Sequence, residues 1–275
     1  MHSPYSTWIG REQTQSDVLT PALLDRFRAT IDSVDVGDTA PQGIHWCLCL
    51  PEAPTAGLGE DGHPLRGGFL PPIELPRRMW ASSKVHFHAP INVGASVERR
   101  STIASVEEKQ GGSGTLIFVT IDHQTLVGGA LAVSEVQTLV YRDAPTDKVV
   151  APKNEGADIS NWAWKRSLTP SQSLLFRFSA LTFNTHRIHY DAPYAQDVEG
   201  YPALVVHGPL TATLLLDLAA RNLGTNQLTT FEFRGMAPAF VGDALHLVGK
   251  QDAGHVALSA LGGDGRVVMS AKATV

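Results

Sequence analysis

The segment formed by residues 210–223 constrains the fold of this chain more strongly than any other. It is rich in alanine and leucine, and before its last turn only Thr211, Thr213 and Asp217 are polar. Pro209 stands at the first helical position, where a missing N–H costs nothing because that donor has no partner within the helix. A helix that is apolar around most of its circumference has to be buried, so the rest of the chain has to enclose it.

Four segments after this helix are predicted to be the strands that enclose it, at residues 228–234, 243–251, 255–261 and 266–274. Breaks that contain glycine separate them. The last two suit antiparallel neighbours joined by the Gly-Gly-Asp-Gly turn at residues 262–265. We therefore expect an α+β fold in which an antiparallel sheet wraps one central helix.

The first half of the chain repeats this plan in a fainter form. Strand candidates lie at residues 85–88, 95–106, 114–124 and 133–141, whereas proline and glycine dominate residues 44–80. The helix of the first half is therefore expected to be shortened or displaced. Between the halves, residues 143–156 are rich in Pro, Lys and Asp and lack apolar periodicity, as linkers do. We expect one fold used twice, in domains 1–155 and 156–275.

Charge and cysteine content restrict the partners and the compartment. With Lys+Arg 22 against Asp+Glu 27, the net charge of −5 argues against a nucleic-acid binder but allows a local basic patch for a phosphorylated ligand. If residues 46–50 are extended, Cys47 and Cys49 face the same side of one strand, which disfavours a disulfide. We therefore expect a soluble cytoplasmic protein. Its thiols are expected to be reduced, and the sequence shows neither a targeting segment nor an apolar stretch long enough to span a membrane.

A dense group of polar residues lies at residues 184–191, after an apolar and aromatic segment at 174–181 that suits a strand. Its sequence, Asn-Thr-His-Arg-Ile-His-Tyr-Asp, is too polar for a simple turn. The imidazole of His189 can both accept and donate a proton near neutral pH, as the reversible addition of water to a double bond requires. The alternative is that His186 and His189 are surface or capping residues.

A second candidate element is His207-Gly208-Pro209, which opens the buried helix. A helix N-terminus at glycine offers unpaired N–H groups and the positive end of the helix dipole. Such donors stabilise a thioester carbonyl that gains negative charge during the reaction. The alternative is that Gly208 only allows a tight entry into the helix.

Together these elements resemble a known motif. The string Phe-Ser-Ala-Leu-Thr-Phe-Asn-Thr-His-Arg-Ile-His-Tyr-Asp at residues 178–191, then Tyr194-Ala195 and His207-Gly208-Pro209-Leu210, resembles the hydratase-2 motif of the MaoC-like dehydratases. The first half resembles the FAS1-like dehydratase N-terminal region through Leu-Pro-Arg-Arg-Met-Trp at residues 75–80. The resemblance implies a double hotdog fold that admits the substrate's pantetheine arm between its halves. It also implies that His189 is catalytic and that the Gly208 N–H polarises the thioester carbonyl.

Position 184 departs from the pattern of many family members, which have an aspartate five residues before the histidine. Asn184 cannot act as a base, but its amide can orient a water molecule. The acid–base work is then expected to fall on His189, alone or helped by His186 or Asp191. A subgroup with Asn-x-His-Arg-Ile-His includes mitochondrial-type 3-hydroxyacyl-thioester dehydratases and mesaconyl-C4-CoA or itaconyl-CoA hydratases. This resemblance implies hydration of a short enoyl-CoA, first of all a C5 dicarboxylic one that yields citramalyl-CoA.

Arginines are the candidates for substrate binding, because guanidinium pairs well with phosphate and carboxylate oxygens. Arg77 and Arg78 are candidates for CoA phosphates, and Arg187 for a substrate carboxylate beside His186. The alternatives are a solvated surface pair and, for Arg187, a structural ion pair with Asp191. We expect no cofactor and no metal, because the histidines at 45, 63, 86 and 88 lack ligand spacing with nearby Cys or carboxylates. A homo-oligomer, a dimer or larger, is the expected assembly.

Three other functions are compatible with the same residues. A 3-hydroxyacyl-ACP or -CoA dehydratase of fatty-acid metabolism would need a long apolar tunnel, whereas a C5 diacid needs a short polar pocket. A non-catalytic acyl-CoA-binding protein could share the fold, and Asn184 keeps this alternative open. A hotdog thioesterase usually needs a carboxylate near the thioester, and none is evident in the sequence beside Gly208.

Overall fold

The computed structural model describes residues 4–34, 37–111, 114–144, 148–153 and 155–275. In this part of the chain all strands belong to a single ten-stranded sheet, in the order β1-β3-β4-β5-β2-β7-β10-β9-β8-β6. The strands are β1 (Glu12–Val18), β2 (Arg77–Phe87), β3 (Ser96–Gly111), β4 (Gly114–Val127), β5 (Ala130–Arg142), β6 (Trp164–Leu168), β7 (Thr230–Gly235), β8 (Leu245–Asp252), β9 (His255–Gly262) and β10 (Val267–Thr274).

The strand order shows that one plan is used twice. If the strands of each half are numbered from one to five, both halves have the order 1-3-4-5-2. The two halves meet where β2 pairs antiparallel with β7, from Ser82↔Arg234 to His86↔Thr230. The two predicted antiparallel sheets are therefore joined at this pair into one continuous sheet. The predicted boundary near residue 155 falls in the connection between β5 and β6, and it remains a prediction.

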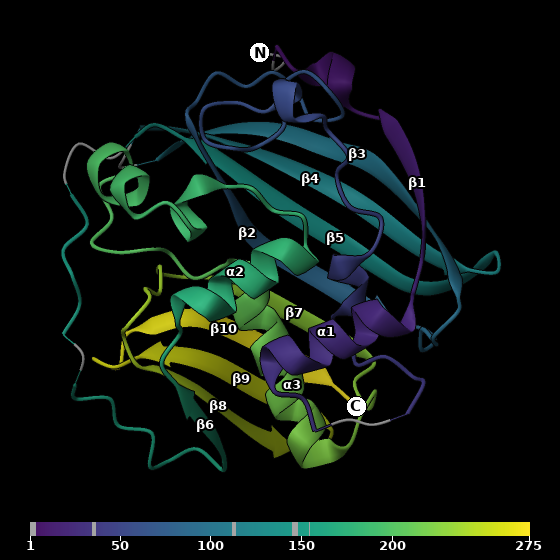
Figure 1. Cartoon of the computed structure of the whole chain (residues 1–275), viewed down its shortest axis with the longest axis vertical. Coiled ribbons are helices and arrows are strands. Elements are labelled where there is room, and N and C mark those ends of the chain that lie inside the picture. Colours follow the sequence, from purple (N-terminus) through teal and green to yellow (C-terminus); the bar gives the residue numbers. More distant parts are fainter. Residues whose placement is uncertain (1–3, 35–36, 112–113, 145–147, 154) are drawn as a thin grey trace.

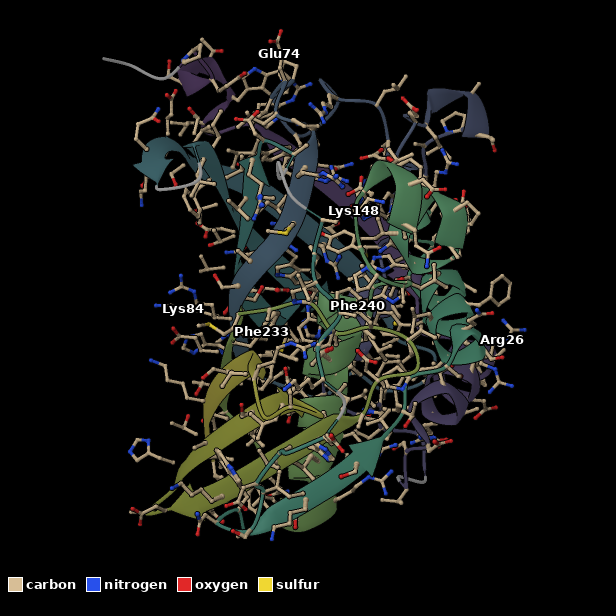
Figure 2. All side chains as sticks on the ribbon, turned by 90° about the vertical axis from the view of Figure 1, so that its left-hand side faces the viewer. Arg26, Glu74, Lys84, Lys148, Phe233 and Phe240 are labelled. Carbon is tan, nitrogen blue, oxygen red and sulfur yellow. The ribbon has the colours of Figure 1, made fainter. Side chains whose placement is uncertain are left out.

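Three α-helices lie against one face of the sheet, as Figure 1 shows: α1 (Pro21–Ile31), α2 (Gln172–Leu181) and α3 (Gly208–Leu223). In the side view, Lys84 of β2 projects from the face of the sheet opposite to the helices (Figure 2). Among the described residues, no helix combines the length and the apolar character that a membrane crossing requires. The remaining helical segments are short turns: η1 (Ser6–Trp8), η2 (Ile44–Cys47), η3 (Thr55–Gly57), η4 (Arg187–His189) and the π-helical η5 (Tyr194–Val198).

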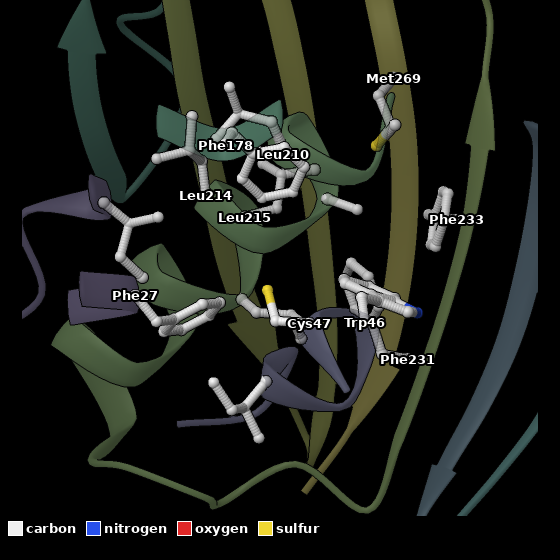
Figure 3. Close-up of a cluster of buried hydrophobic side chains, with 14 of the residues drawn as sticks. Phe27, Trp46, Cys47, Phe178, Leu210, Leu214, Leu215, Phe231, Phe233 and Met269 are labelled. Atoms are coloured by element: carbon white, nitrogen blue, oxygen red, sulfur yellow. The ribbon is translucent and has the colours of Figure 1, made fainter. Parts of the chain in front are cut away.

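The buried helix predicted in the second half is α3, and the four strands predicted after it are β7 to β10. Ten consecutive residues of α3, from Leu210 to Ala219, are buried. Its side chains Leu210, Leu214 and Leu215 pack against Phe178 of α2, and the core continues toward Phe231 of β7 (Figure 3). The burial predicted from the nearly all-apolar circumference is therefore confirmed, because α3 has apolar neighbours on each side.

The first half lacks a matching central helix among its described residues, as the sequence predicted. Between α1 and β2 it has two short turns, η2 and η3, and an irregular segment rich in proline and glycine. Trp46 and Cys47 of η2 extend toward the core around α3 and β7 (Figure 3). One hydrophobic cluster therefore contains residues from both halves, whereas a second cluster, which includes Ile73, Ile103 and Tyr141, lies entirely within the first half.

Residues 174–181 are helical, so the strand predicted there was wrong. Ser171 caps the helix by accepting the N–H of Leu174 at 3.1 Å, and Leu175 and Phe178 are fully buried. This i, i+3 spacing is that of one helix face. Aromatic and branched residues favoured a strand in isolation, but the packing of α2 on α1 and α3 decided the structure.

Residues 46–50 are not one extended strand, the conformation under which the two thiols would share a face. Cys47 ends the turn η2, and Cys49 has a left-handed backbone with φ of +52°. Both cysteines are nonetheless buried free thiols, as expected. The strand β1 and the helix α1, which precede this segment, had not been predicted from the sequence.

Candidate active site

The motif at residues 184–191 is a compact loop between α2 and η5. Phe183 adopts a left-handed backbone, with φ of +46°, just after α2 ends. The Asn184 N–H then donates back to the carbonyl of Ser179 at 2.9 Å, and the side-chain oxygen of Asn184 accepts the N–H of His186 at 3.0 Å. The side-chain nitrogen of Asn184 makes no hydrogen bond to a described residue, so its two N–H donors remain available for a water molecule or substrate.

His189 is held in one orientation by the backbone. Its Nδ1 lies 2.7 Å from the carbonyl oxygen of Val205, so Nδ1 carries the proton and Nε2 carries the lone pair. Burial lowers the pKa of His189 to about 4, although the Val205 carbonyl raises it. The imidazole is therefore neutral at pH 7, which is the form that a general base needs.

His207 connects His189 to the start of α3. Its ring stacks on His189 with centroids 3.6 Å apart, and its Nε2 shares a 2.9 Å hydrogen bond with the hydroxyl of Ser179. The next residue, Gly208, begins α3 and is partly exposed. The Gly208 N–H makes no hydrogen bond to a described residue, as expected for the first donor of a helix. The structure thus brings the two predicted elements together, because His189 lies beside the residue that precedes the N-terminus of α3.

Arg187 is engaged within its own loop. Its Nε and Nη2 both donate to Asp191, at 3.0 and 2.7 Å, and its Nη1 donates to the carbonyl of Glu60 at 3.1 Å. The guanidinium also lies 4.0 Å above the ring centre of Tyr194. These contacts match the alternative in which Arg187 forms a structural ion pair with Asp191.

A loop of the first half, residues 59–65, docks directly onto the motif, a contact that had not been predicted from the sequence. The hydroxyl of Thr185 donates to the carbonyl of Gly62 at 2.5 Å, and the N–H of Arg187 donates to the carbonyl of Asp61 at 2.9 Å. The available signal was Asp-Gly-His-Pro at residues 61–64, a turn sequence with titratable groups. That pattern does not indicate its partner Thr185, which is 123 residues away.

The loop adds a carboxylate and an imidazole to the histidines of the motif. The Nδ1 of His63 donates to Asp61 at 2.9 Å, and the His63 ring lies 4.1 Å from the ring of His186. His186 in turn lies 5.4 Å from His189, centroid to centroid. Although burial raises the pKa of Asp61, the hydrogen bond and positive charge of His63 hold it below its usual value.

The same three side chains could also hold a metal ion. The ligand atoms of Asp61, His63 and His186 lie within 4.8 Å of one another, and two histidines with one carboxylate are a common ligand set. The spacing of histidines along the chain did not reveal this group.

The two adjacent arginines of β2 have different surroundings. Arg77 forms an ion pair with Glu199 and donates to the backbone carbonyls of Val198 and Glu199, so it ties β2 to η5. Arg78 is half-buried beside Tyr141 and makes no ion pair with a carboxylate in the described part of the chain.

Comparison with known proteins assigns the fold and the family. Over residues 43–241 the chain matches the family model described as hydroxyacyl-thioester dehydratase type 2. It is 42% identical over 271 residues to a protein of Chloroflexus aurantiacus named mesaconyl-C(4)-CoA hydratase, covering 97% of this chain and 96% of that protein. The chain belongs to the hydroxyacyl-thioester dehydratase type 2 family. It is accordingly an enzyme of the hydratase and dehydratase class, and the predicted MaoC-like relationship is confirmed.

Solved structures agree with the double hotdog fold. HtdX of Mycobacterium tuberculosis superposes with a TM-score of 0.70 at 19% identity, covering 96% of this chain and 99% of that chain. A second protein of the same organism, described as having a double hotdog fold, superposes with a TM-score of 0.61 at 14% identity, covering 96% and 95%. At these identities the two superpositions show that this chain has the same fold, and they say nothing about its substrate.

Proposed function

We propose that this enzyme adds water reversibly to the double bond of a short enoyl-CoA whose acyl group carries a second carboxylate. Mesaconyl-C4-CoA and itaconyl-CoA, which would give citramalyl-CoA, are the candidate substrates. The observation that carries the proposal is the polar surroundings of His189. Asp61, His63 and His186 lie on one side of it, where a fatty acyl chain would need an apolar wall. The 42% sequence identity to a mesaconyl-C(4)-CoA hydratase supports the same choice.

In the proposed mechanism, His189 is the general base. With mesaconyl-C4-CoA, whose double bond is conjugated to the thioester, Nε2 takes a proton from water as the hydroxyl adds to the β-carbon, and the electron pair of the double bond moves toward the thioester oxygen. The Gly208 N–H and the α3 dipole stabilise that oxygen. The protonated His189 then returns its proton to the α-carbon, which completes the addition of water. Asn184 orients the water through its amide N–H, since its oxygen already accepts from His186.

We further propose that the catalytic residues come from residues 156–275 and that residues 1–155 supply the substrate-binding wall. The contacts of the 59–65 loop with Thr185 and Arg187 support this division. The alternative activity, dehydration of a 3-hydroxyacyl thioester of fatty-acid metabolism, is favoured by the description of the family model.

The experiment that separates these functions follows the absorbance of the enoyl thioester with mesaconyl-C4-CoA, itaconyl-CoA, crotonyl-CoA and a C10 enoyl-CoA in parallel. We expect the highest kcat/KM with one of the two dicarboxylic substrates. A preference for the C10 substrate would assign the fatty-acid alternative. Binding of all four without turnover would assign a non-catalytic acyl-CoA-binding protein.

A further inference from the structure

Two histidines and a carboxylate meet where the first-half loop contacts the motif. Asp61, His63 and His186 each offer a ligand atom within 4.8 Å of the other two, and the two imidazole rings lie 4.1 Å apart. All three residues are partly buried. An ion held between them is therefore partly shielded from water, and the exposed part of the group lets it enter from solvent.

The hydrogen bonds within this group leave lone pairs free for a cation. Nδ1 of His63 donates to Asp61 at 2.9 Å, so the lone pair of the neutral His63 ring is on Nε2. The backbone N–H of His186 donates to Asn184, whereas neither ring nitrogen of His186 makes a hydrogen bond to a described residue. The Asp61 carboxylate accepts two hydrogen bonds from His63, and a carboxylate has about four acceptor positions. Each of the three side chains can therefore still coordinate an ion.

The ligand types and their spacing suit zinc. Zinc binds histidine nitrogen and carboxylate oxygen at about 2.0–2.2 Å, which in a tetrahedral site puts the ligand atoms about 3.4 Å apart. The three ligand atoms then have to approach one another by at most about 1.4 Å, and rotation of partly exposed side chains provides that. Imidazole ligands favour transition metals, whereas Mg²⁺ and Ca²⁺ prefer oxygen ligands. With three protein ligands, one position stays open for water.

Nearby positive charges limit how strongly an ion is held. Arg66 and Arg78 lie close enough to His63 to act on it electrostatically, and their charges repel a cation. The site also lacks the fourth protein ligand of a structural zinc site. Both features favour an ion that exchanges with solvent.

We propose that Asp61, His63 and His186 form a reversible site for a divalent transition-metal ion of the zinc class, and that an ion bound there inhibits the enzyme. The inference goes beyond the proposed function, because this ion is neither a substrate nor a product. Only the inhibition depends on the proposed place of the acyl group beside His189.

The reason for inhibition is the position of His186. Its ring lies 5.4 Å from that of His189, at an interplanar angle of 87°. Coordination turns the His186 ring toward the ion and so changes the surroundings of His189. The ion and its bound water also occupy the polar side of His189, where the proposed function places the acyl group.

An ion at this site also connects the two halves of the chain. Asp61 and His63 belong to the first-half loop, and His186 belongs to the motif. The ion therefore adds a link to the contacts that the loop already makes with Thr185 and Arg187. A ligand that binds only the folded form stabilises it, so zinc should raise the melting temperature.

The first test measures zinc affinity on chelator-treated, dialysed protein, by competition with a chromophoric chelator. We expect wild type to bind one Zn²⁺ per chain, unaffected by excess Mg²⁺. His186→Ala should weaken binding at least about a hundredfold, because loss of an outer hydrogen-bond partner alone costs a metal site roughly 10–100-fold. This variant should also lose the zinc-dependent rise in melting temperature. Equal zinc affinity of wild type and the folded variant would overturn the site, and displacement by Mg²⁺ would overturn the zinc class.

The matched control removes two exposed histidines from β2. The rings of His86 and His88 lie 6.3 Å apart, and both residues are exposed. The double variant His86→Ala/His88→Ala should keep the zinc affinity of wild type. Loss of zinc in this variant, with retention in His186→Ala, would show an adventitious surface ion only and overturn the proposal.

A second variant keeps all three ligands and separates them. A Cβ at Gly62 would clash with the backbone of Thr185, whereas Gly67 has the same φ of +87° and room for a Cβ. Gly62→Ala should therefore bind zinc at least tenfold more weakly than Gly67→Ala. Equal affinities would show that the ligands do not come from both segments, which contradicts the proposed site.

The last test addresses inhibition with the enoyl thioester that wild type hydrates fastest. Saturating Zn²⁺ should lower kcat/KM at least tenfold, a chelator should restore it, and the ratio of the two rates should approach one in His186→Ala. Unchanged or higher activity of zinc-loaded wild type would overturn the inhibitory role. If wild type hydrates no enoyl thioester, the proposed function fails, while the zinc affinities still decide the site. The effect of zinc is then measured on the affinity for butyryl-CoA, which should fall by the same factor.

Discussion

Replacing Gly62 by alanine should detach the first-half loop from the catalytic motif. Gly62 has a backbone φ of +87°, and a Cβ at this position would lie 1.9 Å from the carbonyl oxygen of Thr185 and 2.9 Å from its carbonyl carbon. Contacts this short with backbone atoms cannot be relieved by a side-chain rotation. The loop or the motif has to move.

Two contributions to the loss of stability can be separated. Placing alanine in the left-handed region costs roughly 1–2 kcal/mol. Displacement of the loop also breaks its contacts with the motif: Thr185 to Gly62, Arg187 N–H to Asp61 and Arg187 Nη1 to Glu60. At about 1 kcal/mol net for each hydrogen bond, these contribute about 3 kcal/mol.

Gly67→Ala is a closely matched control. Gly67 has the same φ of +87°, but a Cβ there would lie at an ordinary 3.8 Å from Pro72. Both variants therefore carry the backbone cost, and the difference between them isolates the clash. Urea unfolding should place Gly62→Ala about 3 kcal/mol below Gly67→Ala, and its kcat/KM should fall at least tenfold below that of the control. Equal stability and equal activity of the two variants would refute the docking of this loop on the motif.

Four further predictions follow from the site. His189→Ala should lower kcat by ~10²–10⁴-fold while circular dichroism and the melting temperature stay near wild type; normal turnover by the folded variant would remove His189 from the mechanism. Asn184→Ala should impair turnover, whereas Asn184→Asp should retain appreciable activity, and an inactive folded Asp variant would show that the amide N–H is required. Burial lowers the pKa of His189 and of His123 to about 4. Between pH 6.5 and pH 4 each histidine is therefore neutral in the folded protein but protonated in the unfolded chain. The free energy of unfolding should consequently fall over this range by about 1.4 kcal/mol per pH unit for each histidine. A flat urea midpoint over that window would contradict their burial. Isolated residues 165–275 should aggregate or lack activity, because the edge of β7 and the core face shared with the first half would be exposed; a soluble, fully active fragment would contradict the shared site.

The sequence alone determined the parts of this protein that depend on local pattern. The apolar circumference of residues 210–223 predicted a buried helix, and the spacing of glycines after it predicted the four strands that follow. The string from Asn184 to His189 with His207-Gly208-Pro209 predicted the family. These features lie within short stretches of chain, where periodicity and motif spacing carry the information.

The tertiary structure decided which distant residues meet. Residues 174–181 became a helix because Leu175 and Phe178 pack against other helices, which outweighs the strand preference of aromatic side chains. Asp61 and His63 join His186 because Gly62 allows two backbones to approach closely, and no local pattern in either segment specifies that contact. Arg77 forms an ion pair with Glu199 of the second half, whereas Arg78 lies beside Tyr141 of the first half and makes no ion pair with a described carboxylate, so only the tertiary structure distinguishes these adjacent arginines.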